Sequence, residues 1–256
     1  MKVDKNINFE TEKTLLKQNL NIEINNSIKN CIKYENNFFL NSFKLKNKKI
    51  IEFGCGPFPS SFGIKSKDMP KKYVATDVSN KIIKIAKKND KRLTYKKFDL
   101  EKKFIFKEKF DIIILKGVLH HIKYPEKILI NLRQNLKTDG IMIISEPNLS
   151  SVIGNFLKLI MQFFFNKSME DSPYGQYSFN KISNSAKKAK LYITKVWYSN
   201  LLLMLLTGDY GRIHLFSKNE KLFNIFIFIE DNMQKLFNFF KIAKFIYFKV
   251  NIILKK

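Results

Sequence analysis

Short apolar segments alternate with charged stretches between residues 48 and 148. A run of apolar residues without strict alternation is typical of a strand buried on both faces of a parallel sheet. Ser79 is a suitable N-cap for a helix whose apolar positions begin at Ile82. The pattern therefore predicts successive β-α-β units, with strands at Ile50–Phe53, Lys72–Asp77, Leu93–Leu100 and Phe110–Leu115 and a fifth strand after a turn at Leu136–Gly140.

Helical patterns flank this central region. Residues 11–45 carry unevenly spaced leucines and isoleucines, which favour a helical cap over residues 1–47. Beyond the core at 48–150, residues 152–165 are an inserted helix with more apolar residues than one buried face needs. Residues 201–240, which include a phenylalanine-rich stretch at 222–240, form a second insertion. A helix to about Lys188, a strand near 191–197 and a last strand over 245–254 complete the sheet within residues 151–256, and the last two strands are expected to be antiparallel.

The first strand leads into a glycine-spaced turn. Glu52 lies two residues before Gly54, and Gly56 follows after one residue. Glycines at the carboxyl end of a strand let another molecule approach the main chain closely. Both a dinucleotide fingerprint and a phosphate-binding P-loop require glycine five residues after Gly54, where this chain has Pro59. The turn therefore indicates a nucleotide-like ligand held without a phosphate cradle.

The string from Glu52 to Phe58 resembles the first motif of the class I S-adenosylmethionine (SAM)-dependent methyltransferases, Glu/Asp-x-Gly-x-Gly-x-Gly, with Phe58 in place of the last glycine. The resemblance implies SAM as the cofactor. It also implies an α/β fold: a Rossmann-like, seven-stranded, mostly parallel sheet with helices on both faces, here with helical insertions around strands 5 to 7. Residues 48–150 would then be the SAM-binding core.

Further motifs follow in the order that this family has. Asp77 ends the second strand and resembles the acid that accepts the ribose hydroxyls, and Asp99 resembles the one that accepts the adenine amino group. Singly, such acids are ordinary surface carboxylates or helix caps, and it is their order at successive strand ends that carries the interpretation. The resemblance implies these cofactor-binding residues: Glu52, Gly54, Cys55, Gly56, Asp77, Val78, Asp99, Leu100, Lys116 and Gly117.

The fourth strand leaves through Val118-Leu119-His120-His121, which resembles the family's fourth-strand motif. A bound SAM brings an activated methyl group, so the protein has to align a nucleophile and supply a base where that nucleophile is a hydroxyl. Imidazole titrates near neutral pH, so His120 or His121 is the candidate base. Candidate acceptor contacts are Glu146, Tyr174, Tyr210, Arg212 and His214; alternatively, Glu146 only caps the loop before Pro147.

Composition limits the remaining function classes. With 256 residues and 45% hydrophobic content, the chain suits one α/β domain. The formal charge of +25 invites a nucleic-acid partner, but only three of the 47 basic residues are arginine, which supplies bidentate phosphate contacts. Nucleic acid is therefore disfavoured. Cys31 and Cys55 have neither disulfide-framework nor metal-ligand spacing, and the N-terminus lacks a signal-peptide core, so no metal and a cytoplasmic location are expected.

Three functions stay open at this point. The first is methyl transfer to a small-molecule acceptor or to a lipid- or glycan-linked one. The second is RNA methylation, and the third is a non-catalytic partner protein with the same fold. The excess of phenylalanine and leucine beside lysine after residue 150 fits either a helical cap or homodimer interface, or a peripheral contact with a membrane.

Overall fold

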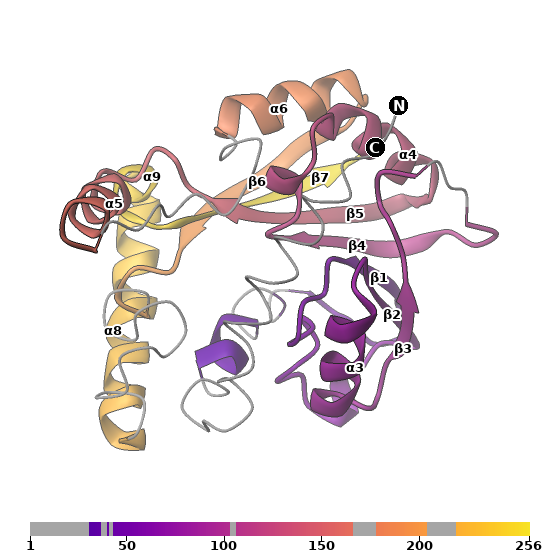
Figure 1. Cartoon of the computed structure of the whole chain (residues 1–256), viewed down its shortest axis with the longest axis horizontal. Helices are drawn as coiled ribbons and strands as arrows, with labels where there is room; N and C mark the ends of the chain where they lie inside the picture. The colour runs from indigo at the N-terminus through magenta and orange to yellow at the C-terminus, as the bar shows by residue number, and fades with distance from the viewer. Residues whose placement is uncertain (1–30, 37–39, 41–42, 103–105, 166–177, 204–218) are drawn as a thin grey trace.

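The computed structural model describes residues 31–36, 40, 43–102, 106–165, 178–203 and 219–256. One sheet of seven strands runs through these residues in the order β3-β2-β1-β4-β5-β7-β6 (Figure 1). Strands β1 to β5 pair in parallel, and β7 is antiparallel to both β5 and β6. The predicted mostly parallel α/β fold is confirmed. The strands are β1 Lys49–Phe53, β2 Lys72–Asp77, β3 Thr94–Lys97, β4 Phe110–Lys116, β5 Leu136–Pro147, β6 Tyr192–Ser199 and β7 Lys249–Lys255.

Both faces of the central strands are buried. Ile51 and Ile113 point to one face, where they join a cluster with residues of α4 and α6. Ile50 and Ile112 join a second cluster on the other face, with Ala86 of α3. This two-sided burial explains the unbroken apolar runs of these strands. The helices are α3 Asn80–Asn89, α4 Pro125–Gln134, α5 Val152–Phe165, α6 Phe179–Lys188, α8 Glu220–Phe239 and α9 Ala243–Ile246, with the 3₁₀ turns η2 Ser66–Asp68 and η3 Leu119–His121.

Local sequence sets where the core helices begin. The Ser79 hydroxyl accepts a hydrogen bond from the Ile82 N–H at 3.3 Å, which confirms the predicted cap of α3. Helix α4 begins at Pro125, where the missing N–H is no loss because the first turn of a helix leaves its N–H groups unpaired.

The two predicted insertions are helices α5 and α8, which lie together with α9 at one end of the sheet (Figure 1). A buried cluster around Leu201, Ala243 and Tyr247 joins α5, α8 and α9. Glu230 of α8 is buried and accepts hydrogen bonds from the backbone N–H groups of Leu201 and Leu202 at 2.8 and 2.6 Å. No described helix is both long enough and apolar enough to cross a membrane.

Two predicted boundaries differ from the structure. The last strand begins at Lys249 rather than at residue 245, because the preceding residues form α9 and a turn held by the Asn148 side chain, which donates to the Lys244 and Tyr247 carbonyls at 2.7 Å each. Strand β5 already begins at Leu136, so the expected turn at 136–140 is extended chain whose first residue pairs with Phe110.

Most of the predicted N-terminal cap lies outside the described residues. Within its described part, residues 31–36 are helical. Cys31 of this segment packs with Leu203 and Phe223 of the C-terminal part. The segment therefore lies between the glycine turn, described below, and helix α8.

Candidate functional site

The two glycines of the turn after β1 have different surroundings. Gly54 and Gly56 have φ angles of 64° and 60°, a backbone region that glycine adopts without strain. A Cβ on Gly54 would lie 2.4 Å from Cγ2 of Val118, so the approach of the β1 and β4 exit loops requires glycine there. A Cβ on Gly56 would meet nothing within 4 Å. The turn therefore leaves space at Gly56, where a ligand can approach the main chain.

The buried side chain of Glu52 stabilises this turn. Its carboxylate is 1% exposed and accepts hydrogen bonds from the Ser60 N–H at 3.0 Å and the Tyr73 hydroxyl at 2.8 Å. Burial raises the pKa of Glu52, while the hydrogen bonds from Ser60 and Tyr73 oppose that rise. Cys55, also in the turn, is buried against the sheet. Both side chains thus have protein partners and fix the shape of the turn.

Phe58 stands where the resemblance expects the third glycine. Its ring is 9% exposed and packs with Ile32 and Phe62. The rings of Phe58 and Phe62 meet edge to face, with their centroids 5.1 Å apart. The side chain is therefore accommodated in an apolar cluster under the N-terminal helix.

Two acids lie at the carboxyl ends of the neighbouring strands: Asp77 is the last residue of β2, and Asp99 follows the end of β3 by two residues. One oxygen of Asp77 accepts the Gly56 N–H at 3.2 Å, and the other accepts the Ser79 N–H at 2.9 Å. Asp77 thereby ties the glycine turn to the start of α3. The carboxylate of Asp99 accepts the Glu101 N–H at 3.0 Å.

The backbone brings these acids close together, because the Phe98 N–H donates to the Asp77 carbonyl at 2.8 Å. Beside them Val78 is 42% exposed, whereas Leu100 is buried. The carboxyl ends of β1, β2 and β3 therefore present a glycine turn, two acids and an exposed valine at one edge of the sheet.

Lys116, at the end of β4, connects the sheet to the N-terminal helix. Its ammonium group donates to Oδ1 of Asn36 at 2.6 Å and lies 3.6 Å from the Glu35 carboxylate. Burial lowers the pKa of Lys116, and the charge of Glu35 opposes that effect. The amide group of Asn36, which is fully buried, donates in turn to the Pro59 carbonyl at 3.0 Å. Sequence reasoning missed Asn36, because a single asparagine in a helical segment gives no pattern.

Gly117 and the two histidines follow Lys116. Gly117 has a φ angle of 65°, and a Cβ there would lie 3.8 Å from Cε1 of His120. His120 Nδ1 lies 2.5 Å from Oε2 of Glu146, at the end of β5. The other Glu146 oxygen accepts the Val118 and Leu119 N–H groups at 3.0 and 2.8 Å. Glu146 is 1% exposed, so it fixes both the exit loop of β4 and the His120 ring.

His121 has a different environment. Its ring lies beside that of His120, with the centroids 4.0 Å apart. Within the described part of the chain, its buried Nδ1 has no hydrogen-bond partner. Burial and the neighbouring His120 lower the pKa of His121 to about 4. At neutral pH His121 is therefore uncharged, and it is a weaker proton acceptor than an ordinary histidine.

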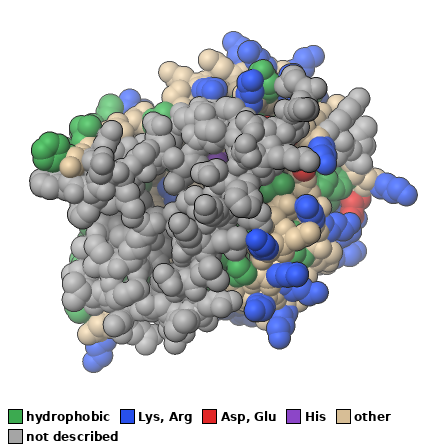
Figure 2. Space-filling model, viewed as in Figure 1, with side chains coloured by type: hydrophobic (Ala, Val, Ile, Leu, Met, Phe, Trp, Pro, Cys, Tyr) green, Lys and Arg blue, Asp and Glu red, His purple; other side chains and the backbone are tan. Residues whose placement is uncertain are grey.

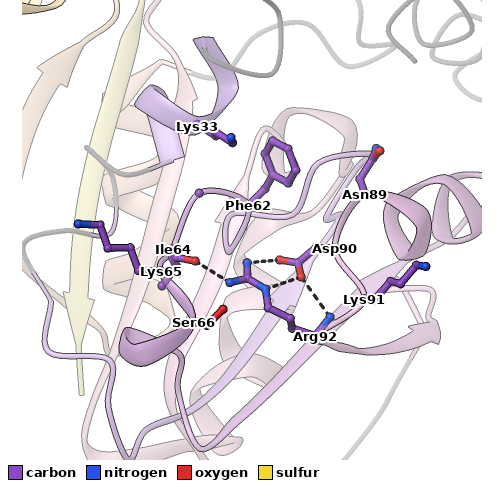
Figure 3. A pocket seen from close by; sticks show the side chains of 10 residues that line it. Lys33, Phe62, Ile64, Lys65, Ser66, Asn89, Asp90, Lys91 and Arg92 are labelled. Carbon is purple, nitrogen blue, oxygen red and sulfur yellow. Dashed lines mark hydrogen bonds and ion pairs between the residues drawn. The ribbon is translucent and has the colours of Figure 1, made fainter. Parts of the chain in front are cut away.

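Four predicted acceptor contacts, Tyr174, Tyr210, Arg212 and His214, lie outside the described residues. A separate pocket of about 490 Å³ lies beyond the glycine turn, between residues 62–66 and 89–92 (Figure 3). In its wall Arg92 donates to the Asp90 carboxylate at 2.6 Å and to the Ile64 carbonyl at 2.6 Å (Figure 3). None of the predicted cofactor residues lines this pocket. Arg92 holds the backbone at Ile64 close to Asp90.

A comparison of the chain with protein-family models matches residues 44–224 to a methyltransferase domain. The chain belongs to the methyltransferase domain family. It is a SAM-dependent methyltransferase of the class I fold, and the glycine turn and acids described above lie within the matched residues. A comparison with curated proteins found no match.

Solved structures of methyltransferases share the fold. One is a plantazolicin methyltransferase in complex with S-adenosylhomocysteine and a pentazolic desmethylPZN analogue, with a TM-score of 0.58, 14% identity and 99% of each chain covered. The magnesium protoporphyrin IX methyltransferase of Synechocystis, also with S-adenosylhomocysteine bound, has a TM-score of 0.56 and 11% identity, covering 97% of this chain and 94% of its own. A SAM-dependent methyltransferase of Archaeoglobus fulgidus has a TM-score of 0.56 and 14% identity, covering 89% and 94%.

The site of this methyltransferase fits the cofactor of its family. The space over Gly56 allows a ligand to contact the main chain, and Asp77 and Asp99 lie at adjacent strand ends. A carboxylate has about four acceptor positions. Asp77 accepts two backbone N–H groups through different oxygens, and its carboxylate is an acceptor of the kind that ligand hydroxyls require.

Proposed function

We propose that this methyltransferase transfers the methyl group of SAM to a hydroxyl of a small-molecule acceptor, with His120 as the general base. The observation that carries the proposal is the buried pair of His120 and Glu146 at the exit of β4, next to Gly117. A base is needed when the nucleophile has to lose a proton, as a hydroxyl does. His121, with its pKa lowered to about 4, is less suited to that role.

The residues that would hold the cofactor belong to the turn and the strand ends. Gly54 and Gly56 shape the turn, and Asp77 would accept the ribose hydroxyls. Asp99 would accept the adenine amino group, with Val78 and Leu100 beside the base. Glu52 and Cys55 would act by keeping the turn in shape, and Lys116 and Gly117 would lie along the amino-acid end. When bound, SAM supplies a methyl group on a sulfonium that is already activated for transfer.

The His120 ring is prepared for proton transfer by its partner. If Nδ1 donates to Oε2 of Glu146, Nε2 is the nitrogen that carries the lone pair. Nε2 then takes the proton of the acceptor hydroxyl as its oxygen attacks, and the imidazolium that forms is stabilised by the Glu146 carboxylate. Because Glu146 is buried and bonded to two backbone N–H groups, it is a positioning residue rather than an acceptor contact in this scheme.

A labelling experiment tests the proposal. The purified protein is incubated with SAM carrying a tritiated methyl group and with separate pools of phenols, carboxylic acids, amines, isoprenoid lipids and total RNA. We expect label in hydroxylated small molecules or in their lipid-linked forms. His120→Gln should lower the rate about 10²- to 10⁴-fold and leave SAM affinity unchanged.

The other two functions give distinct results. Label in RNA alone would overturn the small-molecule proposal in favour of RNA methylation, which should also weaken steeply with salt. A protein that binds no SAM would be a partner protein with a methyltransferase fold. A His120→Gln variant as active as the parent chain would remove His120 from the chemistry. The protein would bind a lipid-linked acceptor at the surface of a bilayer. Size-exclusion chromatography would show whether the protein is a homodimer.

A further inference from the structure

Helix α5 exposes a stripe of large apolar side chains. Val152, Phe156, Leu159 and Phe163 are 61–83% exposed and follow one another at intervals of three and four residues. Such intervals place side chains on one side of a helix. In the space-filling view, apolar side chains are exposed at the upper left, where Figure 1 places α5 and α9 (Figure 2).

Helix α8 is two-sided in the same way. Phe223, Glu230 and Gln234 face the protein and are buried. The other side exposes large apolar side chains, and the exposure continues past the end of the helix. We call these residues and the stripe on α5, whose helices both pack on α9, the apolar helix face. Its members after α5 are Leu222, Ile225, Phe228, Ile229, Leu236, Phe239, Phe240, Ile242 and Phe245.

Among the side chains of α8 and the following residues whose exposure the structure describes, the exposed charges beside the apolar helix face are positive. Its exposed cations are Lys221, Lys235, Lys241 and Lys244. The two acids in the middle of α8 are turned inward. Glu230 accepts the N–H groups of Leu201 and Leu202, and Asp231 accepts the hydroxyl of Tyr34. Exposed phenylalanines with lysines beside them complement a partner surface that has an apolar interior and an anionic outer layer.

We propose that the apolar helix face docks on the surface of a lipid bilayer that contains anionic phospholipids. Phenylalanine and leucine side chains would enter the boundary between headgroups and acyl chains, while the lysines meet the phosphates. A second copy of the chain fits the face less well, because the dimer would bring the lysines of two copies together. The proposal is independent of the acceptor, since docking requires neither SAM nor methyl transfer.

Vesicle binding tests the proposal. The full-length protein is sedimented with vesicles of phosphatidylcholine alone and with vesicles that contain about a third phosphatidylglycerol, at low and physiological salt. We expect strong binding to the anionic vesicles, weaker binding to the neutral ones, and a loss of affinity with salt. Phe163→Glu combined with Phe239→Glu should weaken binding at least tenfold. Each of Lys235→Gln and Lys241→Gln should weaken it about fivefold.

Ile130→Glu is the matched control. Ile130 is an exposed apolar residue of α4, away from the apolar helix face, and its replacement adds one negative charge, as each of the two phenylalanine replacements does. It should bind vesicles like the parent chain. Circular dichroism and thermal unfolding establish that all variants are folded. Equal binding by the double variant and the parent, or no binding to anionic vesicles, would overturn the proposal. It would also be overturned if the parent were a dimer that Phe163→Glu converts to monomers.

Discussion

Replacing Glu146 by glutamine tests the role of the buried pair. The amide oxygen of the new side chain can still accept the Val118 and Leu119 N–H groups, which lie 3.0 and 2.8 Å from Oε1 in the parent chain. The amide NH₂ would replace Oε2, 2.5 Å from Nδ1 of His120, and would have to donate to it. The His120 proton would then move to Nε2, so the ring could no longer accept a proton there.

Two effects of different size follow from this geometry. Exchange of a hydrogen bond to a charged group for one between neutral groups lowers the free energy of unfolding by about 1 kcal/mol, which leaves the protein folded. Loss of the base lowers the transfer rate about 10²- to 10⁴-fold. The assay is the initial rate of methyl transfer at saturating SAM, measured between pH 5 and 9, together with SAM affinity from calorimetry, which should not change.

Glu230→Gln is the matched control for this variant. Glu230 is another buried glutamate that accepts two backbone N–H groups, but it lies in α8. Its replacement should lower thermal stability without lowering the rate. If Glu146→Gln transferred methyl groups at the parent rate and with the parent pH profile, the proposed function of the pair would be refuted.

Three further predictions concern the cofactor turn and its surroundings. Asp77→Ala should weaken SAM binding at least tenfold in calorimetry, because hydrogen bonds to a charged acceptor contribute about 1.5–3 kcal/mol each. The control Asp139→Ala, at an exposed position, should leave SAM affinity unchanged. Unchanged affinity of Asp77→Ala would contradict the place of Asp77 in the site. Gly54→Ala should destabilise the protein by more than the roughly 1–2 kcal/mol that a left-handed backbone costs a non-glycine residue, because the new Cβ would lie 2.4 Å from Val118. In urea unfolding, adding Val118→Ala should recover the part of the lost stability that exceeds this backbone cost. No recovery would contradict the contact. The folded-state pKa of His121, about 4, is below its ordinary 6.5, so the unfolded chain binds more protons between these values and the free energy of unfolding should fall as the pH drops from 6.5 to 4. His121→Gln should remove about 3 kcal/mol of that pH dependence. Identical pH profiles of unfolding for variant and parent would contradict this prediction.

The parts of the fold that sequence predicts best are those with strong local patterns. Unbroken apolar runs located β1, β2 and β4, and the glycine turn located the carboxyl end of β1. The start of β7 was misplaced because residues 245–248 are as apolar as a strand, while the deciding interaction comes from Asn148, nearly a hundred positions earlier in the chain.

The contacts that complete the candidate site were harder to predict. His120 and Glu146 were both singled out, but for separate roles, because the contact between residues 26 positions apart depends on how the ends of β4 and β5 are paired. Asn36 was missed altogether, since its partners Lys116 and Pro59 belong to two other loops. Side-chain pairing between distant strand ends has no local signature in the sequence.

The most direct test of the central claim is calorimetric titration of the purified protein with SAM and S-adenosylhomocysteine, without any acceptor and at two salt concentrations. We expect one site with micromolar affinity that Asp77→Ala weakens and that salt hardly changes. The absence of binding, or equal binding by Asp77→Ala, would contradict the assignment of the glycine turn and the strand ends as the cofactor site.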